Sequence, residues 1–311
     1  PFEGAVFATA YPDRVGCFLV GSAWTRARET FAYEPATGVR PLALVEPWPI
    51  DYAHVVAEEV EVSSADGTRV PLSIVRRKDL ALDGSAPALV EGYAAYGSVA
   101  RPAFRPITLT WVDRGGVFAS CHGRGSGDRG KPWHLDGIKG KKENGVDDFI
   151  ACAEYLVAHG YTTAARLSVT GTSAGGILAG GAITKRPALY AAALLRVPVL
   201  NLVRFEGTEG GPANVPELGT VADPTDFAAL LASDPYHRIT DGASYPAILI
   251  TGGRHDVRVP VWLPAKFAAR MQAASRSGKP VLLRVESDAG HGLGSTRSQT
   301  EEEWADLFAF A

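Results

Sequence analysis

The chain of 311 residues combines 46% hydrophobic with 21% charged residues, which are the proportions of a globular protein and exclude a disordered, collagen-like or coiled-coil chain. Its 31 Lys and Arg nearly balance 34 Asp and Glu, and no apolar run approaches the roughly 20 residues that span a bilayer, so we expect neither a nucleic-acid nor a membrane partner. Because the balanced charge gives no global field, the function must be sought in a local site. Three cysteines are too few for a disulfide framework.

The first fifty residues consist of short alternating segments. Residues 15–20 and 30–33 are typical of strands, and the P-A-T-G sequence at 35–38 predicts the turn after the second. We expect one four-stranded sheet, which is too small to be stable alone, with a boundary at the P-W-P sequence of 47–49. The chain starts without Met or a signal pattern, so we expect the true N-terminus to lie outside it. The compartment stays open, with the cytoplasm favoured.

From residue 55 onward the pattern changes to a hairpin followed by alternating strands and helices. Two β-rich runs, at 58–63 and 68–76, are joined by Ala-Asp-Gly, a strong hairpin signal. Further strands are predicted at 86–90, 117–121, 167–170, 190–195, 247–251 and 281–285. Helices are predicted at 107–114, 146–159, 174–184, 225–232, 261–274 and 300–310. This order predicts an α/β domain over residues 51–311, with a mostly parallel sheet and helices on both faces.

A G-x-S-x-G pentapeptide at residues 171–175 stands between a predicted strand and a predicted helix. This is the pattern of a nucleophile elbow, a strained turn whose glycines are needed because a Cβ would clash in so sharp a bend. In such a turn Ser173 points its Oγ out of the sheet, and the amide of Ala174 faces the incoming carbonyl. The pattern predicts a serine nucleophile, with a Gly-Ser turn that only caps the helix as the alternative.

A serine hydroxyl needs a base to take its proton, so the hypothesis requires an acid and a histidine later in the chain. Asp256 follows the predicted strand at 247–251, and His291 follows the one at 281–285, between two glycines. Loops beyond the carboxyl ends of parallel strands build the site of an open α/β sheet, so we expect both to meet Ser173. The alternative for His291 is an ordinary solvated loop histidine.

Competing residues fit these roles less well. We expect His255 to point elsewhere in the turn, and Asp288 is only three residues before the base, whereas the orienting carboxylate usually comes from a separate strand end. The other histidines and the cysteines lack metal-ligand spacing, so we predict no metal and no cofactor. The glycine-rich segment 123–130 lacks a G-K-[ST] ending and is interpreted as an active-site turn rather than a phosphate loop.

Further motifs follow one another in a fixed order along residues 55–300. They are S-S-A-D-G-T at 63–68, G-Y-A-A-Y-G at 92–97, R-G-S-G at 124–127, W-H at 133–134, D-D-F at 147–149, G-T-S-A-G-G at 171–176, D-P-Y at 234–236, H-D-V-R-V-P at 255–260 and G-H-G at 290–292. In this order they resemble the prolyl oligopeptidase family of serine peptidases. The resemblance implies an α/β-hydrolase catalytic domain, and residues 1–50 resemble the last blade of the family's β-propeller.

The resemblance also implies a role for each matching residue. Ser173 matches the nucleophile, His291 the base and Asp256 the orienting acid. Tyr93 matches the oxyanion tyrosine, whose phenol would join the Ala174 amide in donating to the tetrahedral oxyanion. The remaining matches are substrate-binding positions: Arg258 for a backbone carbonyl, and Tyr96, Val199, Leu218 and Val259 around the residue before the scissile bond.

Four positions, in two segments of the chain, depart from the family pattern. The family's Gly-Tyr-Gly-Gly-Phe is Gly-Tyr-Ala-Ala-Tyr at 92–96, and Asn214 stands where prolyl-specific members carry a tryptophan that stacks on proline. Loss of that aromatic face removes roughly 1 kcal/mol of binding. We therefore predict a pocket that favours small apolar residues without strict proline specificity.

These observations predict a serine peptidase that hydrolyses short peptides through an acyl-enzyme. The expected partners are the short peptide substrate and the remainder of its own β-propeller. Two alternatives stay open: an esterase or acylaminoacyl-type peptidase on the same fold, and a hydrolase-like binding module without turnover. An intact Ser, Asp and His set argues against the second.

Overall fold

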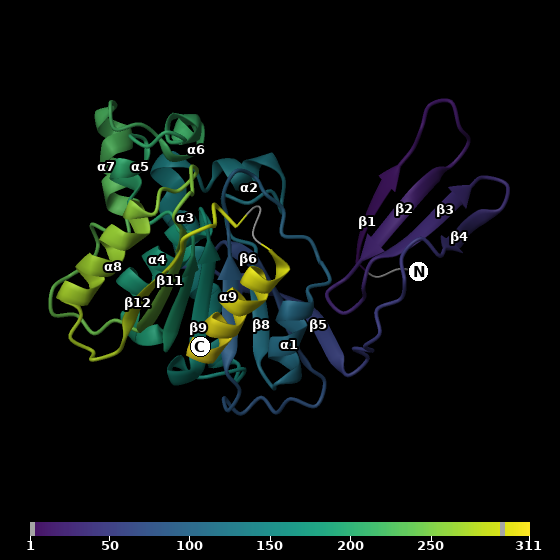
Figure 1. The fold of residues 1–311 in the computed structure, drawn as a ribbon, viewed down its shortest axis with the longest axis horizontal. Coiled ribbons are helices and arrows are strands. Elements are labelled where there is room, and N and C mark those ends of the chain that lie inside the picture. The colour runs from purple at the N-terminus through teal and green to yellow at the C-terminus, as the bar shows by residue number, and fades with distance from the viewer. Residues whose placement is uncertain (1–3, 293–295) are drawn as a thin grey trace.

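The computed structural model describes residues 4–292 and 296–311, so the first three residues of the predicted N-terminal unit lie outside the described part (Figure 1). The described strands form two separate sheets, one with four strands and one with eight. Figure 1 shows the four-stranded sheet set to one side of the larger sheet and its helices.

The small sheet has four strands, as predicted, and is an antiparallel meander in the order β1-β2-β3-β4. Its strands are β1 (Ala5–Thr9), β2 (Cys17–Ser22), β3 (Glu29–Glu34) and β4 (Gly38–Leu42). It contacts the rest of the chain near the loop before the first helix: the Phe104 amide donates to Ser22 Oγ at 3.1 Å, and the Arg101 guanidinium lies over the Phe7 ring.

Little of the small sheet is buried. Among the described residues before 51, the buried hydrophobic side chains are Ala23 and Ala32. Half of the exposed large apolar side chains of the described chain lie in this segment: Val6, Phe7, Tyr11, Val15, Phe18, Tyr33, Val39, Leu44, Val45, Trp48 and Ile50. The segment therefore has almost no core of its own. The division of the chain at residue 50 stays a prediction.

The large sheet has the order β12-β11-β10-β9-β7-β8-β6-β5. Its strands are β5 (Val55–Ser63), β6 (Arg69–Arg77), β7 (Ala88–Gly92), β8 (Val117–Cys121), β9 (Leu167–Thr172), β10 (Ala192–Arg196), β11 (Ala247–Gly253) and β12 (Val281–Glu286). The β5–β6 and β6–β8 pairs are antiparallel and all other pairs are parallel, which confirms the predicted hairpin and mostly parallel sheet. The carboxyl ends of β7, β9, β10, β11 and β12 therefore meet at one edge, where the site lies.

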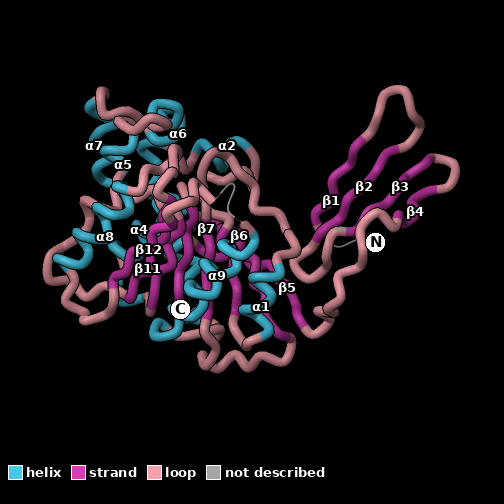
Figure 2. The backbone as a smooth tube through the Cα atoms, in the orientation of Figure 1, coloured by secondary structure: helices cyan, strands magenta, loops and turns pink. Residues whose placement is uncertain are grey.

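Helices cover both faces of this sheet, as predicted (Figure 2). One face packs against α3 (Lys142–Ala158), α4 (Gly175–Lys185) and α8 (Trp262–Ala274), and the other against α1 (Pro106–Asp113) and α9 (Arg297–Phe310). The remaining helices are α2 (Lys131–Leu135), α5 (Leu202–Phe205), α6 (Val215–Leu218) and α7 (Pro224–Ser233), with single 3₁₀ turns η1 (Lys139–Lys141), η2 (Ala164–Arg166), η3 (Pro187–Leu189) and η4 (Pro212–Asn214). The sequence pattern does not predict α2, α5 and α6, because helices of four or five residues are too short to show a 3.6-residue period.

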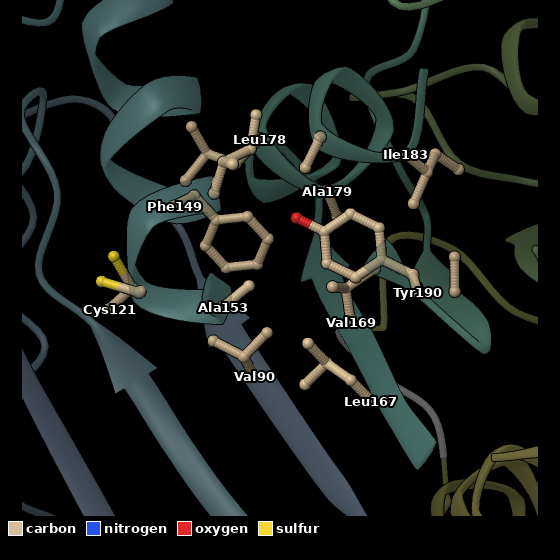
Figure 3. Packing of buried hydrophobic residues seen from close by; sticks show 14 of the residues in the cluster. Val90, Cys121, Phe149, Ala153, Leu167, Val169, Leu178, Ala179, Ile183 and Tyr190 are labelled. Atoms are coloured by element: carbon tan, nitrogen blue, oxygen red, sulfur yellow. The ribbon is translucent and has the colours of Figure 1, made fainter. Parts of the chain in front are cut away.

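The core between the sheet and α3 and α4 holds two of the strands that end at the site, β7 and β9. Phe149 of α3 is fully buried and lies with Leu178 of α4, Val90 of β7 and Val169 of β9 (Figure 3). A Cβ on Gly92 would lie only 2.8 Å from the Phe149 ring, so the end of β7 approaches this helix closely. Burial of a phenylalanine ring contributes about 2–3 kcal/mol, and here it also fixes the spacing of the ends of β7 and β9.

Candidate active site

Ser173 lies in the sharp turn between β9 and α4, with a positive φ of 56°. Its backbone amide donates to the Arg196 carbonyl of β10 at 2.9 Å, which ties the turn to the neighbouring strand. A Cβ on Gly171 would lie 2.2 Å from the Gly175 carbonyl oxygen, and a Cβ on Gly175 would lie 2.5 Å from the Gly92 carbonyl oxygen. Neither position has room for a side chain, so the two glycines of the pentapeptide are required by the bend itself.

The three residues expected to meet at the strand ends do lie together. His291 Nε2 is 2.8 Å from Ser173 Oγ, and His291 Nδ1 is 2.6 Å from Asp256 Oδ2. An ionised carboxylate only accepts hydrogen bonds, so Nδ1 carries the proton and Nε2 is left to accept from the serine hydroxyl. The imidazole and the carboxylate are almost fully buried, with 7% and 1% of their side chains exposed.

Asp256 is held by the backbone of its own turn. Its Oδ1 accepts from the amides of Arg258 and Val259, both at 2.9 Å, which leaves Oδ2 for the histidine. His255 and Asp288, the weaker candidates, are both exposed. The carboxylate that contacts the imidazole is therefore Asp256, at the end of β11. It is not Asp288, three residues before the histidine.

Two groups beside the serine can donate hydrogen bonds: the Tyr93 phenol, after β7, and the Ala174 amide, before α4. Tyr93 directly follows β7, and its side chain lines the same cavity as Ser173. Burial raises the pKa of Tyr93, so the phenol keeps its proton at neutral pH and can donate it in a hydrogen bond. Ala174 is buried and precedes α4, where backbone N–H groups have no carbonyl partner within the helix.

Ser173 opens into a cavity of about 480 Å³. Five of the predicted substrate-binding residues line it, namely Tyr96, Val199, Asn214, Arg258 and Val259. Leu218 does not line it and lies below it, in a buried cluster with Val199 and Val259. Sequence reasoning missed Phe205, Glu209 and Val257 of the lining, which lie in loops and short helices without a periodic pattern.

The amide of Asn214 is already engaged within the protein. Its Oδ1 accepts from the Tyr96 hydroxyl at 2.7 Å, and its Nδ2 donates to the Gly210 carbonyl at 2.8 Å. The cavity wall at this position is therefore polar but satisfied, and the amide has no free donor directed at a ligand. Burial raises the pKa of Tyr96, so its hydroxyl remains the donor in this bond.

The backbone near the site is strained. Ala94 and Tyr96 have positive φ values of 42° and 57°, and Val197, beside the serine turn, has 39°. Such conformations cost roughly 1–2 kcal/mol per non-glycine residue and persist only where the surroundings hold them. Ala94 is also one of the two positions at which alanine replaces glycine in the family pattern.

Within residues 4–292 and 296–311, no group of three or more His, Cys, Asp or Glu side chains is arranged to hold a metal ion. Over the same residues, no helix is long and apolar enough to cross a membrane.

The chain is similar in sequence to a known protein family. The family model for the prolyl oligopeptidase family matches residues 102–311. The prolyl endopeptidase of Elizabethkingia miricola is 37% identical over 82% of the chain and 36% of its own length. The dipeptidyl aminopeptidase BI of Pseudoxanthomonas mexicana is 34% identical over 93% of the chain and 42% of its own length. The chain thus spans well under half of the length of these relatives.

Solved structures extend the likeness to both sheets. A prolyl endopeptidase structure superposes with a TM-score of 0.95 at 38% identity, over 99% of this chain and 46% of the other. Prolyl oligopeptidase B from Galerina marginata gives 0.95 at 30% identity, over 99% and 44%. The large sheet with its helices is therefore an α/β-hydrolase domain, and the small sheet resembles a propeller blade. With its family model, its relatives and its fold in agreement, the chain belongs to the prolyl oligopeptidase family of serine peptidases.

Proposed function

We propose that the protein hydrolyses short peptides through an acyl-enzyme formed on Ser173. The observation that carries this proposal is the unbroken hydrogen-bond chain from Asp256 through His291 to Ser173 at the mouth of the 480 Å³ cavity. Those groups are the nucleophile, base and orienting acid of serine hydrolysis, already within hydrogen-bonding distance of one another.

In the proposed mechanism, Ser173 Oγ attacks the scissile carbonyl while His291 Nε2 takes its proton. The negative charge that develops on the carbonyl oxygen is stabilised by the Tyr93 phenol and the Ala174 amide. The C–N bond then breaks as His291 returns the proton to the leaving amine, which leaves an ester on Ser173. A water molecule, deprotonated by His291, attacks this ester. The bond between the acyl carbon and Ser173 Oγ then breaks as His291 returns the proton to Oγ, and the acid is released.

Arg258 is proposed to hold a backbone carbonyl on the acyl side of the substrate. Its side chain is exposed and lines the cavity, and no hydrogen bond or ion pair engages its guanidinium within the described part of the chain. A guanidinium at such a place can donate to a peptide carbonyl without first breaking an internal ion pair.

Specificity at the residue before the scissile bond is proposed to be broad among small apolar side chains. Asn214 offers proline no aromatic face, so chromogenic peptides that differ only in proline or alanine at this place should differ by less than about tenfold in kcat/KM. Asn214→Trp should shift this ratio toward proline by roughly fivefold or more. Asn214→Leu is the matched control, because it removes the same amide without adding a ring. A strong proline preference in the unchanged chain would contradict the pocket argument.

The proposal is tested by labelling the 311-residue chain with a fluorophosphonate and assaying hydrolysis of peptides beside a simple ester. Labelling at Ser173 together with peptide hydrolysis supports a peptidase. Ester hydrolysis without peptide hydrolysis favours the esterase alternative, and no labelling at all favours a binding module without turnover.

We further propose that the exposed apolar side chains of residues 4–50 are covered by other blades of a β-propeller. The exposed apolar surface and the greater length of the relatives support this partner. The 311-residue chain should therefore self-associate in light scattering, and Val39→Lys on β4 should reduce that association. Leu82→Lys, an exposed change outside the small sheet, is the control. A monodisperse monomer would contradict this proposal.

A further inference from the structure

Three ionisable side chains that the mechanism does not use lie behind the loop of residues 93–97. Glu217 of α6 accepts from Lys142 Nζ on one oxygen and contacts His134 Nε2 with the other, each at 2.7 Å. Lys142 and Glu217 are buried, with 3% and 5% of their side chains exposed. A buried ion pair stabilises a fold less than apolar packing of the same volume would. Its presence beside the site therefore indicates that it holds a part of the site in position, and the backbone that it contacts there is the loop of residues 93–97.

The network touches the loop at two places. Lys142 Nζ lies 3.5 Å from the carbonyl oxygen of Ala94, as its donor. The His134 ring lies against Gly97, where a Cβ would be 3.4 Å from the imidazole. Between these two contacts the loop carries Tyr93 at its start and Tyr96 near its end.

The loop needs such support because its backbone is strained. Ala94 and Tyr96 both adopt the left-handed conformation without being glycine. The carbonyl of Ala94, the first of these strained residues, accepts from the Lys142 ammonium. The Tyr96 hydroxyl is bound by Asn214, which lies three residues before Glu217 in the same η4–α6 segment. One short segment therefore fastens both strained residues, one directly and one through Lys142.

Charge couples the network to the same phenols. After burial, which is the larger cause, the negative charge of Glu217 further raises the pKa of Tyr93 and of Tyr96. Burial lowers the pKa of Lys142, while Glu217 opposes that shift and favours the ammonium form. Removal of the ammonium would therefore take away one of the two side chains that contact Glu217 beside these phenols.

We propose that His134, Lys142 and Glu217 form a positioning network that holds the backbone of residues 93–97, so that the Tyr93 phenol stays directed at the oxyanion. The network touches neither substrate nor reacting atoms and acts through the loop that carries Tyr93 and Tyr96. This inference rests on the proposed function, because it concerns the donor that stabilises the transition state.

The test is a double-mutant cycle on peptide hydrolysis between Lys142→Met and Tyr93→Phe. Alone, Lys142→Met should lower kcat about tenfold and change KM less than about twofold, since the lost interaction matters in the transition state. In the Tyr93→Phe background Lys142→Met should lower kcat less than about twofold, because the phenol that Lys142 helps to position is already gone.

Affinity for a peptide aldehyde, which forms an oxyanion on Ser173, should fall in parallel with kcat. Lys185→Met, which removes an ion pair with Asp147 away from the site, is the matched control.

A second variant separates positioning from stability. Lys142→Met with Glu217→Met replaces the whole buried pair by apolar side chains, so the thermal midpoint should recover from any loss that Lys142→Met causes. kcat should stay low, because the donor to the Ala94 carbonyl is still missing. If Lys142→Met does not fold, this double variant replaces it in the cycle with Tyr93→Phe.

Two results would overturn the inference. One is an equal loss from Lys142→Met in the Tyr93 and Tyr93→Phe backgrounds, and the other is a return of kcat together with stability in the double variant. Failure of the proposed function is distinguishable from both, because the unchanged chain would then not hydrolyse peptides at all.

Discussion

Ser173→Ala and His291→Ala should each lower kcat for a peptide substrate by about 10⁴-fold or more. The double variant should be hardly worse than either single one, because the hydroxyl and the imidazole act as one unit: without the base the hydroxyl is a poor nucleophile, and without the hydroxyl the base has no proton to take. Steady-state kinetics on a chromogenic peptide measure both effects.

Two exposed neighbours serve as controls for this result. His255→Ala and Asp288→Ala lie in the same two loops but outside the hydrogen-bond chain, so each should retain nearly full activity. If the losses from Ser173→Ala and His291→Ala multiplied independently, the assignment of the triad would be wrong. If Asp288→Ala were as damaging as His291→Ala, the orienting carboxylate would have been misassigned.

Tyr93→Phe should lower kcat by roughly 10²- to 10³-fold while KM changes little. The change keeps the ring that packs beside Tyr96 and removes only the hydroxyl, so the thermal midpoint should stay close to that of the unchanged chain. The loss falls on kcat because the phenol donates most strongly to the charge that appears on the carbonyl oxygen in the transition state.

Tyr33→Phe is the control for the tyrosine, since it makes the same chemical change on an exposed residue of the small sheet. An unchanged turnover number for Tyr93→Phe would mean that the phenol is an ordinary aromatic at the end of a strand. The Ala174 amide would then be the main donor to the oxyanion.

The sequence by itself determined the fold class and the serine turn that we propose carries the nucleophile, because both depend on local patterns. The hydrophobic run of β8 predicted a strand with the bounds that the structure has, Val117–Cys121, and the other long elements lie within a few residues of their predicted ranges. The elbow at Ser173 was predictable because the bend admits no Cβ at Gly171 or Gly175, a constraint that leaves its mark on consecutive residues.

Only the tertiary structure decided which distant side chains meet. The sequence favours Asp256 over Asp288 because Asp256 follows a separate strand, but its contact with His291 depends on the adjacency of β11 and β12, which places the turn after β11 beside that histidine. Leu218 is a second example. Its match to a pocket position predicted a place in the cavity wall, but in the folded chain its side chain is buried and does not line the cavity.

The network behind the Tyr93 loop was out of reach of sequence reasoning altogether. Glu217 is 83 residues from His134 and 75 from Lys142, and no periodic pattern links positions on helices that meet only after the chain has folded. In the sequence each looks like a solvated surface charge, the usual place of such residues. Burial of two of them against the active-site loop is a consequence of how α2, α3 and α6 pack together.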